Sequence, residues 1–315
     1  MTSVVAIFGP TGSGKTDIAV RVAAALGTEV VNCDPAQCYA GLPILTNQPE
    51  PEHDAIAPHR MIGIWPMRHE ASFVGFARDA HAELDALAAD RGVAVACGGS
   101  GLYLQAALTH LPDGERGGTP ELETAARELL EARYAEEGGG VLHAELASLD
   151  PDVAARVHAN DRARLIRALE VAQRGESISP DGGSHWDAEQ RHPTRLFGLG
   201  VDRDVIRERI TGRTARMFGA GVLDEVAALA GPQGELAEEA FSHTARKLHG
   251  LGDCLGVLSG EWSRDRAIEL MTIRTRQYAK RQDTWARRWP GIEFVEATDG
   301  DVGRIAGDIL RRLRG

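Results

Sequence analysis

An eight-residue segment close to the N-terminus constrains this chain more than any other: Gly9-Pro10-Thr11-Gly12-Ser13-Gly14-Lys15-Thr16. It matches the pattern G-x-x-x-x-G-K-[ST], a glycine-rich turn from strand to helix whose backbone N–H groups surround phosphate oxygens. The flanking residues fit, since Val4 to Phe8 is apolar and β-branched and Lys15 to about Leu26 is alanine-rich and helical in pattern. We therefore expect a diphosphate or triphosphate site, with Lys15 on the terminal phosphate and Thr16 as a ligand of Mg²⁺. The alternative is a chance glycine-rich turn that opens a helix.

Two more strands are expected to end near this segment. One covers about Glu29 to Asn32 and leads to Asp34, and the other covers Val93 to Cys97 and leads to Gly98-Gly99-Ser100-Gly101. A helical pattern separates them. This alternation predicts an α/β fold with a parallel sheet, in which ligands bind at the carboxyl ends of the strands. Asp34 and Ser100 should therefore lie beside the phosphate-binding segment.

The character of the sequence changes over residues 113–192, where helical patterns occur without a convincing strand and Gly, Pro and Ser residues close the segment. The helical patterns expected beyond the first one are about Phe73 to Ala89, Leu122 to Ala135, Ala163 to Arg174, Arg203 to Ala230 and Ser263 to Arg288, with a strand at Arg195 to Val201. We predict a P-loop parallel-sheet core built from residues 1–112 and 193–315. Residues 113–192 are predicted to form a mainly helical lobe inserted into that core.

The composition narrows the class of protein. A net charge of −11 argues against indiscriminate nucleic-acid binding, although a local basic groove can exist on an acidic body. No apolar run reaches the roughly 18 residues of a membrane span, and the N-terminus lacks the pattern of a signal peptide. The four cysteines include no Cys-x-x-Cys pair, so neither a zinc site nor a disulfide framework is expected. We expect a cytoplasmic protein with no membrane contact.

Several classes of phosphate-binding protein remain open at this point. The chain lacks the Asn-Lys-x-Asp motif of GTPases, and Val93 to Cys97 ends in glycines where a motor ATPase would carry a metal-binding carboxylate. A small-molecule kinase and a non-catalytic nucleotide-binding module both fit the phosphate loop alone. Lysine is rare, since only Lys15, Lys247 and Lys280 occur among 35 basic residues. Such rarity suggests that a compact ammonium is preferred at each of these positions.

Five segments of the chain occur in a characteristic order. They are Gly9 to Thr16; Asp34-Pro35-Ala36-Gln37-Cys38-Tyr39; Gly98-Gly99-Ser100-Gly101-Leu102-Tyr103; Asn160-Asp161 through Arg164, Arg167 and Ala168-Leu169-Glu170; and Thr275-Arg276-Gln277-Tyr278-Ala279-Lys280-Arg281-Gln282 with Thr284-Trp285. Together they resemble the tRNA dimethylallyltransferases, also called tRNA isopentenyltransferases, from the first strand to about Trp289. The chain departs from that family's pattern at Pro35 and Ser100, where the family has Ser and Thr. It also departs at Lys247-Leu248-His249-Gly250-Leu251, where the family has Lys-x-Ile-Gly-Tyr.

The resemblance implies transfer of a dimethylallyl group from dimethylallyl diphosphate to the exocyclic amine of the adenosine 3′ of the anticodon. This amine is a poor nucleophile and needs a base, for which Asp34 stands at the matching family position. The departing diphosphate needs positive charge and hydrogen-bond donors, which Lys15, Arg213, Ser100 and Mg²⁺ on Thr16 are expected to supply. The expected catalytic residues are thus Asp34, Ser100 and Arg213. Arg276, Lys280 and Arg281 are expected to join the phosphate loop in binding the diphosphate or nucleotide.

The family pattern also implies contacts with the tRNA anticodon stem-loop. The residues expected to make them are Asp34, Pro35, Ala36, Gln37, Ser100, Ala163, Arg164, Arg167 and Lys247. Four candidates have a structural alternative to their functional role: Asp34 as a turn cap, Ser100 as a turn residue, Arg213 as a solvated arginine, and Arg167 in an ion pair with Glu170. For the tryptophans near the C-terminal motif, burial in the core is favoured.

Two rival enzyme functions stay open. One is isopentenyl transfer to free AMP or ATP, against which the helical lobe argues because it suits a macromolecular acceptor. The other is a small-molecule P-loop kinase, against which the segment from Arg276 to Trp285 argues. The expected partners are tRNA and dimethylallyl diphosphate, and the expected state is a monomer.

Overall fold

The computed structural model describes residues 2–110, 120–175, 189–230, 236 and 240–315, with only the backbone described for residues 120–125 and 163. The chain divides into two compact units: residues 1–109 with 190–315, and residues 110–189. The inserted lobe was expected at 113–192. Where the chain leaves the first unit and returns to it, Thr109 and Gln190 form an antiparallel bridge. Each unit is described by itself below.

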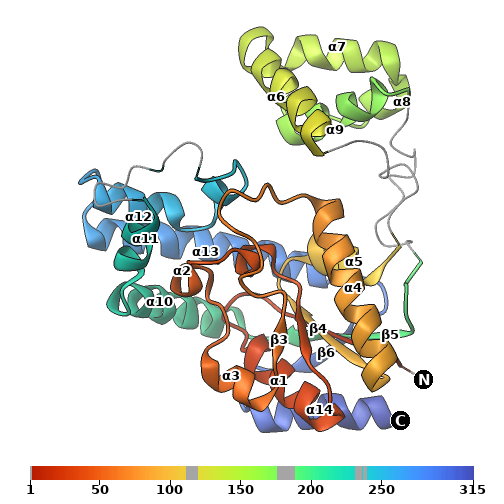
Figure 1. The fold of residues 1–315 in the computed structure, drawn as a ribbon, viewed down its shortest axis with the longest axis vertical. Helices are drawn as coiled ribbons and strands as arrows, with labels where there is room; N and C mark the ends of the chain where they lie inside the picture. Colours follow the sequence, from red (N-terminus) through yellow and green to blue (C-terminus); the bar gives the residue numbers. More distant parts are fainter. Residues whose placement is uncertain (1, 111–119, 176–188, 231–235, 237–239) are drawn as a thin grey trace. The chain divides into compact units, whose positions relative to one another are not determined.

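The first unit is built on a six-stranded sheet in the order β3-β2-β4-β1-β5-β6, with parallel pairing between all neighbours (Figure 1). Its strands are β1 (Val4–Phe8), β2 (Val30–Asn32), β3 (His59–Arg60), β4 (Ala94–Gly98), β5 (Thr194–Gly200) and β6 (Glu293–Glu296). Every residue of β1 and β4 is buried, as expected for parallel strands covered on both faces. The predicted α/β class with a parallel sheet is confirmed.

Helices surround this sheet and connect its parallel strands. The helices of the first unit are α1 (Lys15–Leu26), α2 (Pro43–Thr46), α3 (Pro51–Ile56), α4 (Phe73–Arg91), α5 (Gly101–Leu108), α10 (Arg203–Gly219), α11 (Val222–Ala230), α12 (Leu251–Leu258), α13 (Arg264–Ala286) and α14 (Val302–Arg314). Short 3₁₀ helices cover Pro35–Cys38 and Ala245–Lys247. Ile18 and Val22 of α1 share one buried cluster with Val5 of β1 and Ile305 of α14. This cluster fixes the start of α1 against the sheet, where the phosphate loop leads into it.

One expected helix is divided in two. The prediction of a single helix from Arg203 to Ala230 is wrong, because α10 ends at Gly219 and α11 begins at Val222. Gly221 lies between them with a φ of +96°, a conformation that glycine adopts readily and other residues avoid. The amphipathic pattern continues through this break, so periodicity alone does not reveal it.

The second unit is helical over its described residues. It contains α6 (Pro120–Glu137), α7 (Gly139–Leu149), α8 (Pro151–Ala154) and α9 (Arg162–Ala172). Leu142 and Leu146 of α7 pack with Leu165 and Leu169 of α9 in a separate core cluster. The expected helices at Leu122 to Ala135 and Ala163 to Arg174 correspond to α6 and α9. In the described parts of both units, no helix is long and apolar enough to cross a membrane.

Candidate functional site

The predicted phosphate-binding segment forms the turn between β1 and α1. Gly12 and Gly14 have φ values of +84° and +80°, which a side chain would strain. The Ser13 N–H donates to the Pro10 carbonyl at 3.1 Å and closes the turn. Because Gly14 caps α1 without a side chain, no side-chain oxygen occupies the N–H groups of its first turn. This geometry suits an anion held by backbone donors at a helix N-terminus.

Two cations meet at this turn. Lys15 opens α1, and Arg213 of α10 donates from Nη1 to the Thr11 hydroxyl at 2.5 Å. Burial is the main cause that lowers the pKa of both groups; Asp34 raises both, and Arg213 lowers that of Lys15 further. Neither cation forms an ion pair with a carboxylate among the described residues. Buried charges are normally paired, so this arrangement favours an anionic ligand.

A glutamine from the far end of the chain holds the phosphate loop in place. The Gln282 side chain, 4% exposed on α13, accepts from the Thr11 N–H at 2.9 Å and donates to the Gly99 carbonyl at 2.7 Å. A Cβ at Gly99 would lie 2.5 Å from the Gln282 amide nitrogen, so only glycine fits there. The loop after β1 and the loop after β4 are therefore joined through one buried amide.

Asp34 lies at the carboxyl end of β2, near enough to Lys15 and Arg213 to raise the pKa of both. One carboxylate oxygen, Oδ1, accepts from the Ala36 N–H at 3.1 Å and caps the 3₁₀ helix that begins at Pro35. The cap that was the alternative for Asp34 is therefore present. Pro35 fits because the first helical position needs no N–H donor. The second carboxylate oxygen makes no hydrogen bond in the described part of the chain, so Asp34 can cap the turn and still present an oxygen to a ligand.

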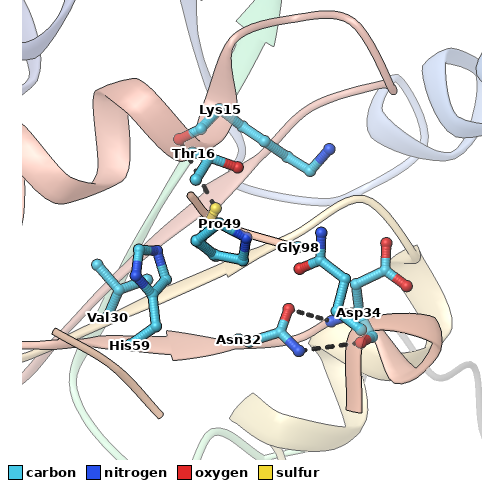
Figure 2. A pocket seen from close by; sticks show the side chains of 10 residues that line it. Lys15, Thr16, Val30, Asn32, Asp34, Pro49, His59 and Gly98 are labelled. Carbon is cyan, nitrogen blue, oxygen red and sulfur yellow. Dashed lines mark hydrogen bonds between the residues drawn. The ribbon is translucent and has the colours of Figure 1, made fainter. Parts of the chain in front are cut away.

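Lys15, Thr16 and Asp34 line one pocket (Figure 2). The remaining lining residues are Val30, Asn32, Gln37, Pro49, His59, Cys97 and Gly98. His59 hydrogen-bonds through Nδ1 to Asp54 at 2.7 Å, while its buried Nε2 has no partner in the described residues. Burial lowers the pKa of His59, which favours the neutral ring. A neutral imidazole bonded in this way leaves Nε2 as a hydrogen-bond acceptor.

Ser100 lies close to an aromatic residue that the sequence did not assign to the site. It precedes α5 and makes no side-chain cap hydrogen bond to that helix. Burial raises the pKa of Tyr278 of α13, as does nearby Asp34, while hydrogen bonding with Ser100 and Gln282 acts in the opposite direction. Ser100, Tyr278 and Gln282 therefore form a polar group beside Asp34. The Ser100 hydroxyl contributes to this group and does not cap α5.

The oxygen donors of the pocket fit Mg²⁺ in kind. Mg²⁺ prefers oxygen ligands and commonly takes one or two protein groups together with substrate phosphates and water. The Thr16 hydroxyl and the Asp34 carboxylate line the same pocket. In the described residues there is no cluster of three or more His, Cys, Asp or Glu side chains suited to a metal. A metal here would therefore take most of its ligands from the diphosphate.

The basic residues of α13 are placed less directly. Arg276 donates to Thr211 of α10 at 2.8 Å and not to the phosphate loop. Arg281 lies over the Tyr278 ring at 5.7 Å, and Lys280 is exposed. The favoured core packing of the tryptophans is seen at Trp289, which is 8% exposed and packs edge-on against Phe8. Arg281 thus contacts Tyr278 and directly precedes Gln282, two members of the polar group around Ser100. Arg276 instead contacts α10.

The residues expected to contact tRNA are divided between the two units. In the first, Gln37 donates to the Asn47 carbonyl at 2.5 Å and Lys247 is exposed. In the second, Arg164 lies 3.5 Å from Asp161 with its side chain 78% exposed, and Arg167 lies 3.5 Å from Glu170. The ion pair that was the alternative for Arg167 is present. Ala163 belongs to α9, and only its backbone is described.

Three residues of the site have no signal in the sequence that reveals their role. Asn32 and His59 belong to short strands and read as ordinary strand residues. Gln282 stands in the C-terminal motif, but its partners lie 271 and 183 positions away. Only folding brings these atoms together. For Asn32 and Gln282 the one hint is a buried amide, at the end of a strand or within an amphipathic helix, because a buried amide must find hydrogen-bond partners.

Comparisons with known proteins identify the family of the chain. The model of the "IPP transferase" family matches residues 37–289, and that of "Isopentenyl transferase" matches residues 2–56. A tRNA dimethylallyltransferase of Anaeromyxobacter sp. is 36% identical over 99% of each chain. Another, from Streptomyces griseus, is 38% identical over 96% of this chain and 93% of its own.

Solved structures extend the likeness to the fold. A tRNA isopentenylpyrophosphate transferase from Staphylococcus epidermidis superposes with a TM-score of 0.69 at 26% identity, covering 100% of this chain and 99% of its own. A eukaryotic dimethylallyltransferase described as acting on tRNA gives a TM-score of 0.80 at 25% identity, covering 98% of this chain and 77% of its own. Because the family model covers residues 37–289 and the two relatives are 36% and 38% identical over nearly the whole chain, this chain belongs to the IPP transferase family, the tRNA dimethylallyltransferases.

Proposed function

We propose that this chain transfers a dimethylallyl group from dimethylallyl diphosphate to the exocyclic amine of the adenosine 3′ of the anticodon in tRNA. One observation carries the proposal. Lys15 and Arg213 meet at the phosphate loop, neither pairs with a carboxylate of the described residues, and Asp34 is close enough to raise the pKa of both. The site thus combines an anion cradle with a carboxylate, which suits a reaction with an anionic leaving group and a nucleophile that must lose a proton.

The leaving group determines the work of the cations. As the allylic C–O bond breaks, negative charge grows on the diphosphate, and Lys15, Arg213 and the loop N–H groups stabilise it more strongly than in the ground state. Mg²⁺ held by Thr16 would supply further positive charge to the same oxygens. The Ser100 hydroxyl, beside Tyr278, contacts the diphosphate or the entering nucleotide. Arg281 and Lys280 add positive charge from α13.

Asp34 performs the proton transfer. Its free carboxylate oxygen accepts a proton from the adenine amine as the new C–N bond forms, and the diphosphate leaves with the electron pair of the broken C–O bond. The adenosine must leave its stacked position to reach this oxygen, as enzymes that modify a base require. The anticodon stem-loop contacts residues of both units: Pro35, Ala36, Gln37 and Lys247 of the first, and Ala163, Arg164 and Arg167 of α9. We place the protein in the cytoplasm as a monomer.

The acceptor decides between this function and its nearest rival. Purified protein is incubated with labelled dimethylallyl diphosphate and Mg²⁺, and with bulk tRNA, AMP or ATP in parallel. Label is expected in tRNA alone, and Lys15→Ala should reduce transfer to it strongly. Label in AMP or ATP would favour free-nucleotide prenylation. Phosphoryl transfer from ATP without any prenyl transfer would favour a kinase.

A further inference from the structure

A buried amide two residues before the proposed base binds its backbone on both sides. Asn32, the last residue of β2, is 3% exposed. Its Oδ1 accepts from the Asp34 N–H at 3.0 Å, and its Nδ2 donates to the Asp34 carbonyl at 3.0 Å (Figure 2). Both polar atoms of the Asp34 main chain are therefore held by one side chain.

The same amide reaches a second segment of the pocket. Its Nδ2 also donates to the Met61 carbonyl at 3.1 Å. Met61 has a φ of +62°, a left-handed conformation that residues other than glycine rarely adopt and that needs support from its surroundings. It follows β3 two residues after His59, which lines the pocket. Asn32 thus connects the turn of Asp34 to the strand that carries His59.

These contacts fix where the carboxylate points. The Asn32 amide uses both of its hydrogens and its oxygen on three main-chain groups, so the amide is fully satisfied despite its burial. It holds Asp34 at φ −117° and ψ 109°, and the bond from the Ala36 N–H then fixes one carboxylate oxygen. Only the other oxygen is left to meet a substrate. Rotation of the Asp34 backbone would move that oxygen out of reach of the amine.

We infer that Asn32 is a positioning residue for the transfer reaction, which acts through Asp34 by holding its main chain and therefore its free carboxylate oxygen. The inference rests on the proposed function, in which Asp34 is the base. Although Asn32 lines the same pocket as Lys15, it makes no hydrogen bond to Lys15 or Arg213 in the described structure, so its effect should appear in the chemical step. Positioning of a reacting group within a fraction of an ångström has large effects on rate.

A double-mutant cycle tests this. Asn32→Ala should lower kcat at least about 10-fold while the KM for dimethylallyl diphosphate stays within about 2-fold. In the background of Asp34→Ala, the same change should alter the residual rate less than about 2-fold, because a residue that acts through another has no effect once that residue is gone. Gln105→Ala is the matched control: it removes an amide that is also 3% exposed, from α5, and should leave kcat unchanged.

A second variant keeps the test valid if Asn32→Ala folds poorly. Asn32→Asp keeps the shape and an acceptor for the Asp34 N–H, but it loses the amide hydrogens that bind the Asp34 and Met61 carbonyls. It should therefore lower kcat while the KM for dimethylallyl diphosphate stays within about 2-fold, a split that a merely structural residue would not give. Asn32→Ser, with one small hydroxyl, should recover part of the rate lost in Asn32→Ala.

The outcomes separate the inference from the proposed function. If Asp34→Ala leaves turnover unchanged, Asp34 is not the base, and the inference fails with that assignment. If Asp34→Ala strongly lowers turnover but the Asn32 effect on the residual rate is additive in the double mutant, the inference alone is overturned. A fall in kcat of Asn32→Asp that is matched by a parallel rise in KM would likewise show that Asn32 only stabilises the fold.

Discussion

At the scale of single residues, the site is defined by two cations, Lys15 and Arg213, that pair with no carboxylate of the described residues. Arg213 has the Thr11 hydroxyl as its hydrogen-bond partner, whereas Arg207, on the same helix, pairs with Asp204 and has a side chain that is 62% exposed. Two arginines six positions apart thus have different environments. The difference lets their roles be separated by experiment.

Arg213→Met should lower kcat and raise the KM for dimethylallyl diphosphate, with a combined loss in kcat/KM of about 10² or more, because a preorganised cation stabilises the leaving group. Inorganic pyrophosphate should raise the Tm of the unmodified protein by binding the folded state, and this gain should shrink in the variant. Steady-state kinetics and thermal melts measure both. Arg207→Met serves as the control and should match the unmodified protein. Equal behaviour of the two variants would remove Arg213 from the site.

The sequence was sufficient to predict those site residues whose role depends on a contiguous motif. Gly9 to Thr16 form the loop between β1 and α1 as expected, because the strand, the glycines and the helix start are all contiguous in the chain. Asn32 and Gln282 were not assigned a role, because their contacts are with main-chain atoms, most of them far away in sequence. Hydrogen bonds to main-chain groups leave no trace in the identity of the partner residue.

At the scale of elements, α13 is the part that joins the two loops of the site. Gln282 bridges the Thr11 N–H and the Gly99 carbonyl, and Trp285 lies so close to Gly101 that a Cβ there would meet its ring at 2.0 Å. The helix therefore packs directly on the start of α5. The tight fit explains why the loop after β4 is rich in glycine.

Gln282→Leu should destabilise the first unit by about 2 kcal/mol or more, because it leaves the Thr11 N–H and the Gly99 carbonyl without their partner. The phosphate loop should also become less ordered, so the KM for dimethylallyl diphosphate should rise. Denaturant unfolding and kinetics measure the two effects. Gln277→Leu, an exposed change on the same helix, should alter stability by less than about 0.5 kcal/mol. If both variants unfold alike, the bridge is not a stabilising contact.

Elements were predicted well where periodicity is long and uninterrupted. The prediction for α1 matches the observed bounds, and α4 and α13 differ from theirs by a few residues. The strands β3 and β6, of two and four residues, were not predicted because such short segments carry too little alternation. The break between α10 and α11 depends on Gly221, and a lone glycine within an amphipathic pattern does not by itself end a helix.

At the scale of the whole molecule, buried histidines couple stability to pH. Burial is the first cause that lowers the pKa of His59 and His81 below the ordinary value of 6.5. Because their folded-state pKa values lie below the unfolded ones, they contribute fully above about pH 6.5, and the contribution is lost as pH falls through the folded-state values. The protein should therefore lose stability between neutral and mildly acidic pH.

His81→Gln should reduce this pH dependence. His81 is 9% exposed and hydrogen-bonds through Nε2 to the Ala106 carbonyl at 2.8 Å, a bond that a glutamine amide can keep. The drop in Tm between neutral and mildly acidic buffer should be smaller in the variant than in the unmodified protein. His243→Gln changes an exposed histidine and should leave the drop as it was. An identical drop in all three proteins would show that other groups dominate the acid response.

An acidic protein can recognise RNA only through local features of its surface. With a net charge of −11, affinity for RNA must come from a few local contacts and from unstacked loop bases.

Modification of a short anticodon stem-loop therefore tests the central claim most directly. The protein, Mg²⁺ and dimethylallyl diphosphate are incubated with a synthetic stem-loop, and the product is analysed by mass spectrometry. A second stem-loop carries purine riboside, which lacks the exocyclic amine, in place of the target adenosine. We predict the gain of one dimethylallyl group on the first RNA and none on the second. Equal modification of both, or a stem-loop left unmodified while AMP or ATP is prenylated, would contradict the account.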